Sequence, residues 1–100
     1  MYRTFFGMLF LTVVVSEAQA ESGLASYYSY GNRGRPDELT CAHRTRPFGT
    51  MVRVTHGSRS IVCKVNDRGP FIRGRVIDLS VSAARALGMM QSGVVRVSLD

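Results

Sequence analysis

A β-hairpin pattern runs through residues 51–66, MVRVTHGSRSIVCKVN. Apolar and polar residues alternate over residues 51–55 and again over residues 60–66, which is the period of a strand with one buried face. The intervening residues 56–59, His-Gly-Ser-Arg, contain the glycine that a short hairpin turn favours. The stretch therefore predicts an antiparallel pair of strands, and with it a β-rich domain.

Further short strands are predicted on either side of this hairpin. Small and aromatic residues favour a first strand over residues 24–30, and a loop rich in turn-forming and charged residues follows over residues 31–38. Two more apolar runs, over residues 75–79 and 93–99, favour later strands.

One helix is predicted between the last two strands. Ser80 is a favourable N-cap and Gly88 a favourable stop, so the helix should span residues 81–87. Five or six short strands with one helix before the last strand suggest a small closed barrel, which leaves no strand edge exposed. The helix residues expected to face the core are Val81, Ala84 and Leu87.

The first twenty residues have the pattern of a secretory signal peptide. Arg3 precedes an apolar run of eleven residues, 5–15, and the small-residue motif Ala18-Gln19-Ala20 follows. A helix that crosses a bilayer needs roughly 20 apolar residues. We therefore predict cleavage near Ala20, no stable membrane anchor, and a single mature domain over residues 21–100 that is periplasmic or secreted.

The predicted mature part is small and basic. Removing residues 1–20 takes away Arg3 and Glu17, so twelve Lys/Arg and six Asp/Glu remain and the net charge stays at +6. Twelve of the thirteen cations in the whole chain are arginine, whose donors match carboxylates and phosphates. An anionic partner is expected, although the charge is also explained as a solubilising surface. Without an aromatic-basic nucleic-acid motif, cell-wall polymers and membrane surfaces are favoured over nucleic acid.

Cys41 and Cys63 are the only cysteines. An even count in an oxidising compartment favours one disulfide, and two buried free thiols are the alternative. A core built from eighty residues is marginal, and the disulfide could add roughly 3 kcal/mol by restricting the unfolded chain. Two Cys and two His without close spacing do not form a zinc cage, so no metal is expected.

Polar side chains concentrate in residues 39–50 and 65–80. Asp67 comes directly after the second strand of the predicted hairpin, and Gly69-Pro70 makes the chain leave the sheet at once. A carboxylate in this position is expected at a barrel rim. The alternative is a structural carboxylate that caps its own turn.

Four motifs together resemble the rare lipoprotein A (RlpA) family. The resemblance covers nearly all of residues 23–99 and implies a mainly all-β fold: a six-stranded double-psi β-barrel with one short inserted helix, related to expansin and barwin-type domains. The motifs, in the family's order, are Gly-Leu-Ala-Ser-Tyr-Tyr (23–28), Thr-Cys-Ala-His with Pro-Phe-Gly-Thr (40–43 and 47–50), Asn-Asp-Arg-Gly-Pro-Phe (66–71) and Gly-Arg-Val-Ile-Asp-Leu-Ser (74–80).

The resemblance also implies an activity. RlpA-like proteins cleave peptidoglycan glycan strands by a lytic transglycosylase reaction that leaves a 1,6-anhydro end, without a cofactor. The family's functional acid falls on Asp67 and its histidine on His43. One carboxyl group can protonate the glycosidic oxygen and then take the proton of the C6 hydroxyl, while His43 could orient it or share the proton. The residues expected to contact the glycan are Asp37, Thr40, Arg68, Tyr28 and Phe71.

Structural and non-catalytic interpretations of the same residues are also open. His43 is also explained as a hydrogen-bonded structural histidine, and Asp78 as a helix-start or barrel-closing residue. The loop over residues 31–38 is short and lacks the family's Thr-Ala-Ser-Gly-Glu-like segment, which favours a non-catalytic, expansin-like wall-binding module. A secreted effector or inhibitor on the same scaffold is a third possibility, because a fold alone does not fix function. A monomer is expected in each case.

Overall fold

The computed structural model describes residues 20–28 and 38–100. The predicted signal peptide before Ala20 and most of the predicted loop, with Asp37, lie outside these ranges. Of the helices described, none is long and apolar enough to span a membrane. The elements are β1 (Glu21–Tyr27), β2 (Thr40–Ala42), β3 (Met51–His56), β4 (Arg59–Asp67), β5 (Arg75–Leu79), α1 (Val81–Leu87) and β6 (Val95–Leu99).

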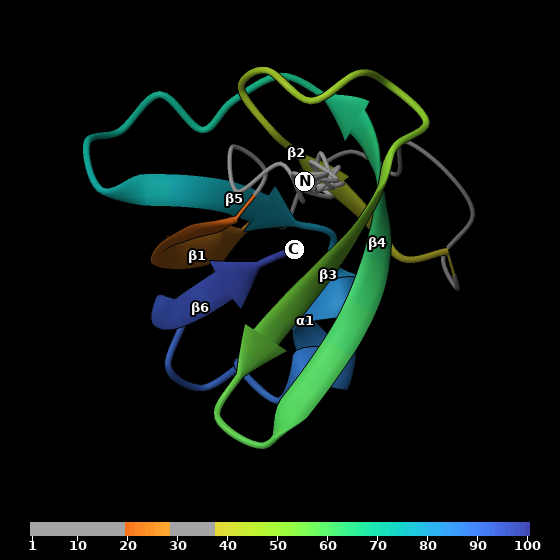
Figure 1. The fold of residues 1–100 in the computed structure, drawn as a ribbon. Helices are drawn as coiled ribbons and strands as arrows, with labels where there is room; N and C mark the ends of the chain where they lie inside the picture. Colours follow the sequence, from red (N-terminus) through yellow and green to blue (C-terminus); the bar gives the residue numbers. More distant parts are fainter. Residues whose placement is uncertain (1–19, 29–37) are drawn as a thin grey trace, which may run out of the picture.

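The six strands close into a barrel in the order β1-β5-β2-β4-β3-β6 (Figure 1). The pairs β1–β5 and β2–β4 are parallel, and the other four neighbouring pairs are antiparallel. Closure gives every strand two neighbours, which removes the exposed edges that an open sheet of this size would have. The predicted fold class, a mainly β six-stranded barrel with one short helix, is confirmed.

The predicted hairpin is confirmed, and β3 pairs with β4 from Met51↔Lys64 to His56↔Arg59. The first strand begins three residues earlier than predicted, at Glu21, because its start pairs with β6 in the register Glu21↔Leu99. β2 was not visible as a strand in the sequence pattern. It has three residues, all buried, and is held between β5 and β4.

The barrel core follows from the alternation along the strands. On β4, Ile61, Cys63 and Val65 are buried, whereas Val62 and Lys64 between them are exposed. The disulfide between Cys41 and Cys63 is confirmed: it joins β2 to β4 inside the core, with a Cα–Cα distance of 5.8 Å.

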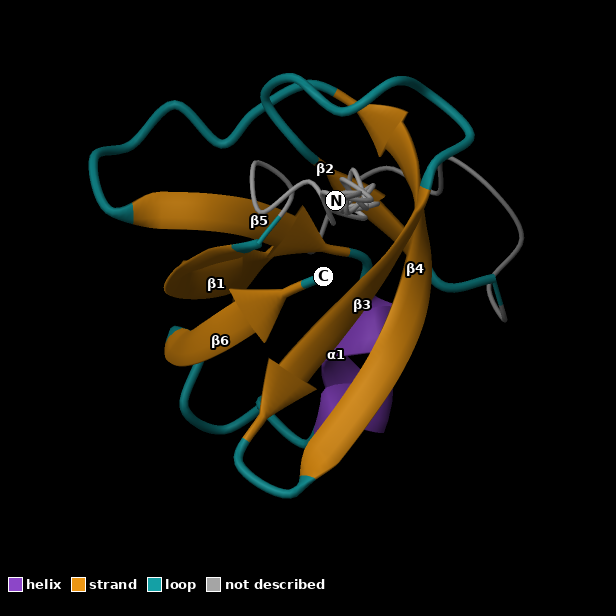
Figure 2. Ribbon diagram, viewed as in Figure 1, coloured by secondary structure: helices purple, strands orange, loops and turns teal. Residues whose placement is uncertain are grey.

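Helix α1 begins and ends at the predicted caps. The Ser80 hydroxyl accepts a hydrogen bond from the Ala83 N–H, and Gly88 has the left-handed φ of 79° that favours glycine. Ala84 and Leu87 are buried as predicted, but Val81 is only half-buried and Ala83 is buried beside them. The helix packs mainly against β4 (Figure 2).

Candidate functional site

Two loops leave the barrel at the same end. β2 continues into loop residues 43–50 and β4 into loop residues 68–74, and the two strands are parallel neighbours (Figure 1). The His43 N–H donates to the carbonyl oxygen of Asp67 at 3.1 Å, which joins the starts of the two loops. Both motifs that the sequence singled out are therefore at one rim of the barrel.

Asp67 and Asp78 lie on either side of Ala42 on the barrel's outer face. Ala42 of β2 pairs with Asp67 of β4 on one side and with Asp78 of β5 on the other, and Asp78 pairs in turn with Ser26 of β1. Paired residues project to the same face of a sheet, and here that face is opposite the one that holds buried Ile77. Two strand spacings, about 9–10 Å, separate the backbones of the two aspartates.

Burial raises the pKa of the Asp78 carboxyl above its ordinary value of 3.8. The negative charge of Asp67 acts in the same direction, while a hydrogen bond from the Ser26 hydroxyl (3.0 Å) and the positive charge of Arg75 oppose it. Asp78 thus keeps its proton at a higher pH than an exposed aspartic acid. A carboxyl with this property is suited to donating a proton.

We expect Asp78→Asn to stabilise the fold at neutral pH. The folded-state pKa of Asp78 is raised, so folding favours the protonated form. The ionised carboxyl therefore destabilises the folded state above that pKa, and the penalty disappears below the unfolded value of 3.8. The amide keeps an oxygen that can accept from Ser26.

Thermal unfolding of the two proteins between about pH 3 and about pH 8 measures this effect. The advantage of the variant should grow as the pH rises and vanish at the acid end. Asp100→Asn, which removes an exposed carboxylate, is the matched control and should shift the melting temperature little. Equal melting temperatures of Asp78→Asn and the native chain at neutral pH would contradict the expectation.

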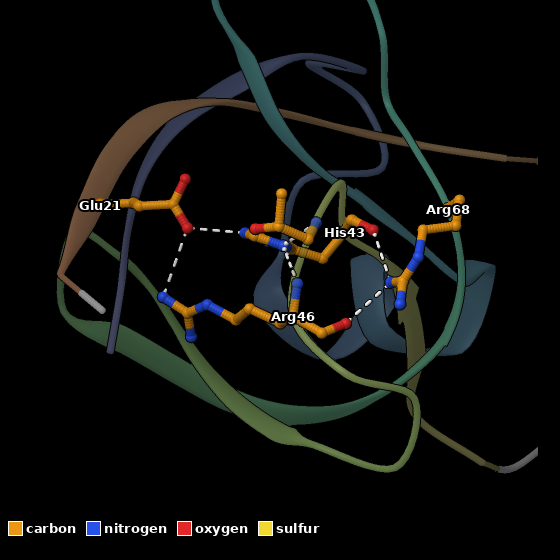
Figure 3. Close-up of polar contacts among 5 residues, drawn as sticks. Glu21, His43, Arg46 and Arg68 are labelled. Carbon is orange, nitrogen blue, oxygen red and sulfur yellow. Dashed lines mark hydrogen bonds and ion pairs between the residues drawn. The ribbon is translucent and has the colours of Figure 1, made fainter. Parts of the chain in front are cut away.

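His43 is buried, and both of its ring nitrogens are hydrogen-bonded (Figure 3). Nδ1 accepts the backbone N–H groups of Thr45 (3.1 Å) and Arg46 (3.0 Å), so the ring proton is on Nε2. Nε2 donates it to Oε1 of Glu21 at 2.6 Å, and Nη2 of Arg46 lies 3.4 Å from the same oxygen. The imidazole is thus brought to Glu21, and His43 reaches Asp67 through the backbone only.

Arg68 ties the two loops together. Its Nη1 donates to the carbonyl oxygens of His43 (3.1 Å) and Arg46 (2.7 Å), as Figure 3 shows, and its guanidinium lies over the ring of Phe48, 4.3 Å from the centroid. The Arg68 backbone N–H donates to Oδ1 of Asp67 at 2.8 Å. This local bond restrains the Asp67 side chain.

The other predicted glycan contacts fall into two places. Tyr28 and Thr40 lie together, with their hydroxyl oxygens 3.1 Å apart, and Thr40 is two residues before Ala42 on the same face of β2. Phe71 is 78% exposed in the loop after β4. Asp37 lies outside the described residues.

Three residues of this rim were missed by sequence reasoning: Glu21, Phe48 and Ser26. Glu21 and Ser26 depend on which strands pair, which no local pattern reveals. Phe48 lies in the Pro-Phe-Gly-Thr motif (47–50), and the arginines just before it were the available sign of a cation–π contact. The sequence favours a structural role for Asp78, although its alternation with Ile77 and Leu79 places it on the outer face.

Comparison with known proteins identifies the family. A family model described as "Lytic transglycolase" matches residues 20–99. The probable endolytic peptidoglycan transglycosylase RlpA of Nostoc sp. is 50% identical over 91 residues, which cover 78% of this chain and 24% of that protein. The endolytic peptidoglycan transglycosylase RlpA of Campylobacter jejuni is 36% identical over 105 residues, which cover 94% of this chain and 38% of that protein. The chain thus spans well under half the length of these curated relatives.

Solved structures show the same fold. An expansin of Clavibacter michiganensis superposes with a TM-score of 0.69 at 24% identity, covering 82% of this chain and 50% of that one. The Streptomyces papain inhibitor gives a TM-score of 0.65 at 23% identity, covering 83% and 94%. At these identities both likenesses show the fold alone. With the family model matched over the whole barrel and RlpA proteins as its relatives, the chain belongs to the lytic transglycolase family.

Proposed function

We propose that this protein is a peptidoglycan lytic transglycosylase that cuts glycan strands and leaves 1,6-anhydro ends. The observation that carries the proposal is the placement of Asp67 and Asp78 on one outer face, on either side of Ala42. In glycoside hydrolases, the carboxyl pairs that flank a scissile bond are about 5–9.5 Å apart, a separation that two strand spacings allow. The names of the RlpA relatives support the same reaction.

The two carboxyls divide the proton transfers between them. Asp78, whose pKa is raised, donates its proton to the glycosidic oxygen as the bond from that oxygen to C1 breaks. Asp67 accepts the proton of the C6 hydroxyl as O6 bonds to the same C1. One proton is given and one is taken, no water is consumed, and return of the proton from Asp67 to Asp78 resets the site.

His43 acts in this proposal as a positioning residue. Its ring is anchored to Glu21, and its backbone N–H holds the carbonyl of Asp67. Tyr28 and Phe71 remain proposed glycan contacts, whereas Thr40, which is 3% exposed, would act through its contact with the Tyr28 hydroxyl. Asp37 remains a proposed contact from the sequence alone.

The proposed site of action is outside the cytoplasm, after cleavage at Ala20, as a monomer without a membrane anchor. β1 begins at Glu21, directly after the Ala-Gln-Ala motif, so cleavage there would leave every strand of the barrel intact. A buried disulfide is typical of oxidising compartments.

Digestion of purified sacculi tests the function. Mass analysis should find muropeptides lighter by one water than the products of hydrolysis, as expected for anhydro ends. The rival wall-binding module predicts co-sedimentation with sacculi that weakens steeply with salt and no new glycan ends. Binding without new ends would therefore replace the enzyme by the module, and hydrolysed ends would contradict the reaction type.

A further inference from the structure

We propose that Arg68 is a specificity-determining residue that binds a carboxylate carried by the glycan, next to the catalytic pair. This inference rests on the proposed function and deepens it, because it names the substituent that the site distinguishes. It concerns binding, so it can be tested without turnover.

The guanidinium of Arg68 is held in one orientation. Both N–H groups of Nη1 are directed to the backbone carbonyls of His43 and Arg46 (Figure 3). The guanidinium also lies over the ring of Phe48. An arginine fixed in this way loses little further conformational freedom when it binds a ligand.

The opposite edge of the same guanidinium is available. Within residues 20–28 and 38–100, Nε and Nη2 of Arg68 make no hydrogen bond, and the residue is exposed. This edge presents two parallel N–H donors, which is the geometry that a carboxylate accepts with both oxygens. Arg68 therefore uses one nitrogen to build the rim and keeps two for a ligand.

The surroundings favour an anion that is attached to an apolar body. Loops 43–50 and 68–74 contain four arginines and no acidic residue. Of the two nearest carboxylates, Glu21 is engaged by His43 and Arg46, and Asp67 accepts the backbone N–H of Arg68. Phe48 and Phe71 are 60% and 78% exposed in the same two loops, so both rings offer apolar surface to a ligand.

Peptidoglycan offers such a ligand. Every second sugar of its strands carries a lactyl carboxyl group, which is either free or extended by a peptide that has carboxylates of its own. Chitin has the same linkage between N-acetylglucosamine units but no carboxyl. A carboxylate held by Arg68 would distinguish the two polymers and would place the substituted sugar at a set distance from Asp67.

The test compares the binding of tetrasaccharides by calorimetry. The ligands are muramyl tetrasaccharides with free lactyl carboxyls, with stem peptides, or with all carboxyls amidated, together with chitotetraose. The native chain should bind a carboxylated ligand about tenfold to a hundredfold more tightly than the amidated one, as expected for a charge-assisted, two-point contact. Whichever of the first two ligands shows the preference identifies the source of the carboxylate.

Substitutions at Arg68 should remove this preference. Arg68→Lys keeps the charge but loses the paired donors, and Arg68→Gln loses both. In both variants the ratio of the affinities for the carboxylated and the amidated ligand should fall toward one. The control is Arg85→Gln at a distant, exposed arginine on α1, which should leave this ratio unchanged. This ratio does not depend on the folded fraction, so the test remains valid if the substitution destabilises the two loops. A ratio unchanged in Arg68→Gln, or no preference in the native chain, would overturn the inference. A preference for carboxylated ligands without cleavage of sacculi would overturn only the proposed reaction. Cleavage without this preference would overturn only the present inference.

Discussion

Asp67→Asn should lower the rate of release of anhydro-ended muropeptides by about 10²–10⁴-fold, the usual contribution of a placed proton-transfer group. The amide has nearly the shape of the carboxyl and can still accept the Arg68 N–H, so the rim should be preserved. It cannot take the proton of the C6 hydroxyl, and the second half of the proposed reaction therefore fails. The measurement is the initial rate of product release from sacculi, quantified by mass.

The control for this variant is Asp100→Asn, which removes an exposed carboxylate directly after β6 and should retain the native rate. Binding of sacculi by Asp67→Asn should also persist, because the proposed glycan contacts are unchanged. Native activity in a folded Asp67→Asn protein would remove Asp67 from the reaction and leave Asp78 as the sole candidate carboxyl.

Loss of the disulfide should have the largest effect on stability. Cys41 and Cys63 are 22 residues apart, and a cross-link of that span stabilises a fold by roughly 3 kcal/mol, because it restricts the unfolded chain. The double variant Cys41→Ser/Cys63→Ser should lose about this amount, and more because it places two hydroxyls in a core where both positions are fully buried. Urea unfolding should show a lower midpoint.

A reductant separates the cross-link from the change of side chain. Dithiothreitol present during unfolding should lower the midpoint of the native chain and leave that of the double variant unchanged. Cys41→Ala/Cys63→Ala is the apolar control, and its unfolding midpoint should lie between those of the oxidised native chain and the serine double variant. A midpoint of the alanine variant equal to that of the oxidised native chain would show that the disulfide does not stabilise the fold.

The activity should also depend on the disulfide. β2 has only three residues and carries Ala42 between the two aspartates, so the disulfide fixes the strand that spaces them. The stability of this short strand depends on its neighbours and on the cross-link, since three residues supply few contacts of their own.

Local chemistry made much of the fold predictable. The hairpin over β3 and β4 followed from alternation and a glycine turn, and α1 from Ser80 and Gly88. These signals act within a few residues, and sequence reasoning therefore places them well. β2 was not predicted because three buried residues show no periodicity. The start of β1 was predicted three residues too late because its partner β6 is more than seventy residues away in the sequence.

The candidate site divides in the same way. Asp67 was placed at the rim by the strand before it and the Gly69-Pro70 turn after it. The environment of His43 could not be predicted from its motif, because its partner Glu21 lies 22 residues earlier, on a different strand. The role of Asp78 likewise depends on burial and on Asp67, which the closed strand order brings near.

The pairing of Glu21 with Leu99 has a consequence for how such a barrel can be used. The first and last strands are adjacent and antiparallel, so polypeptide can enter and leave the unit at neighbouring points. A unit of this kind can be spliced into a larger architecture with little distortion, as domains with close termini commonly are. The two RlpA relatives described above, in which the matching region occupies 24% and 38% of the sequence, fit that pattern of reuse.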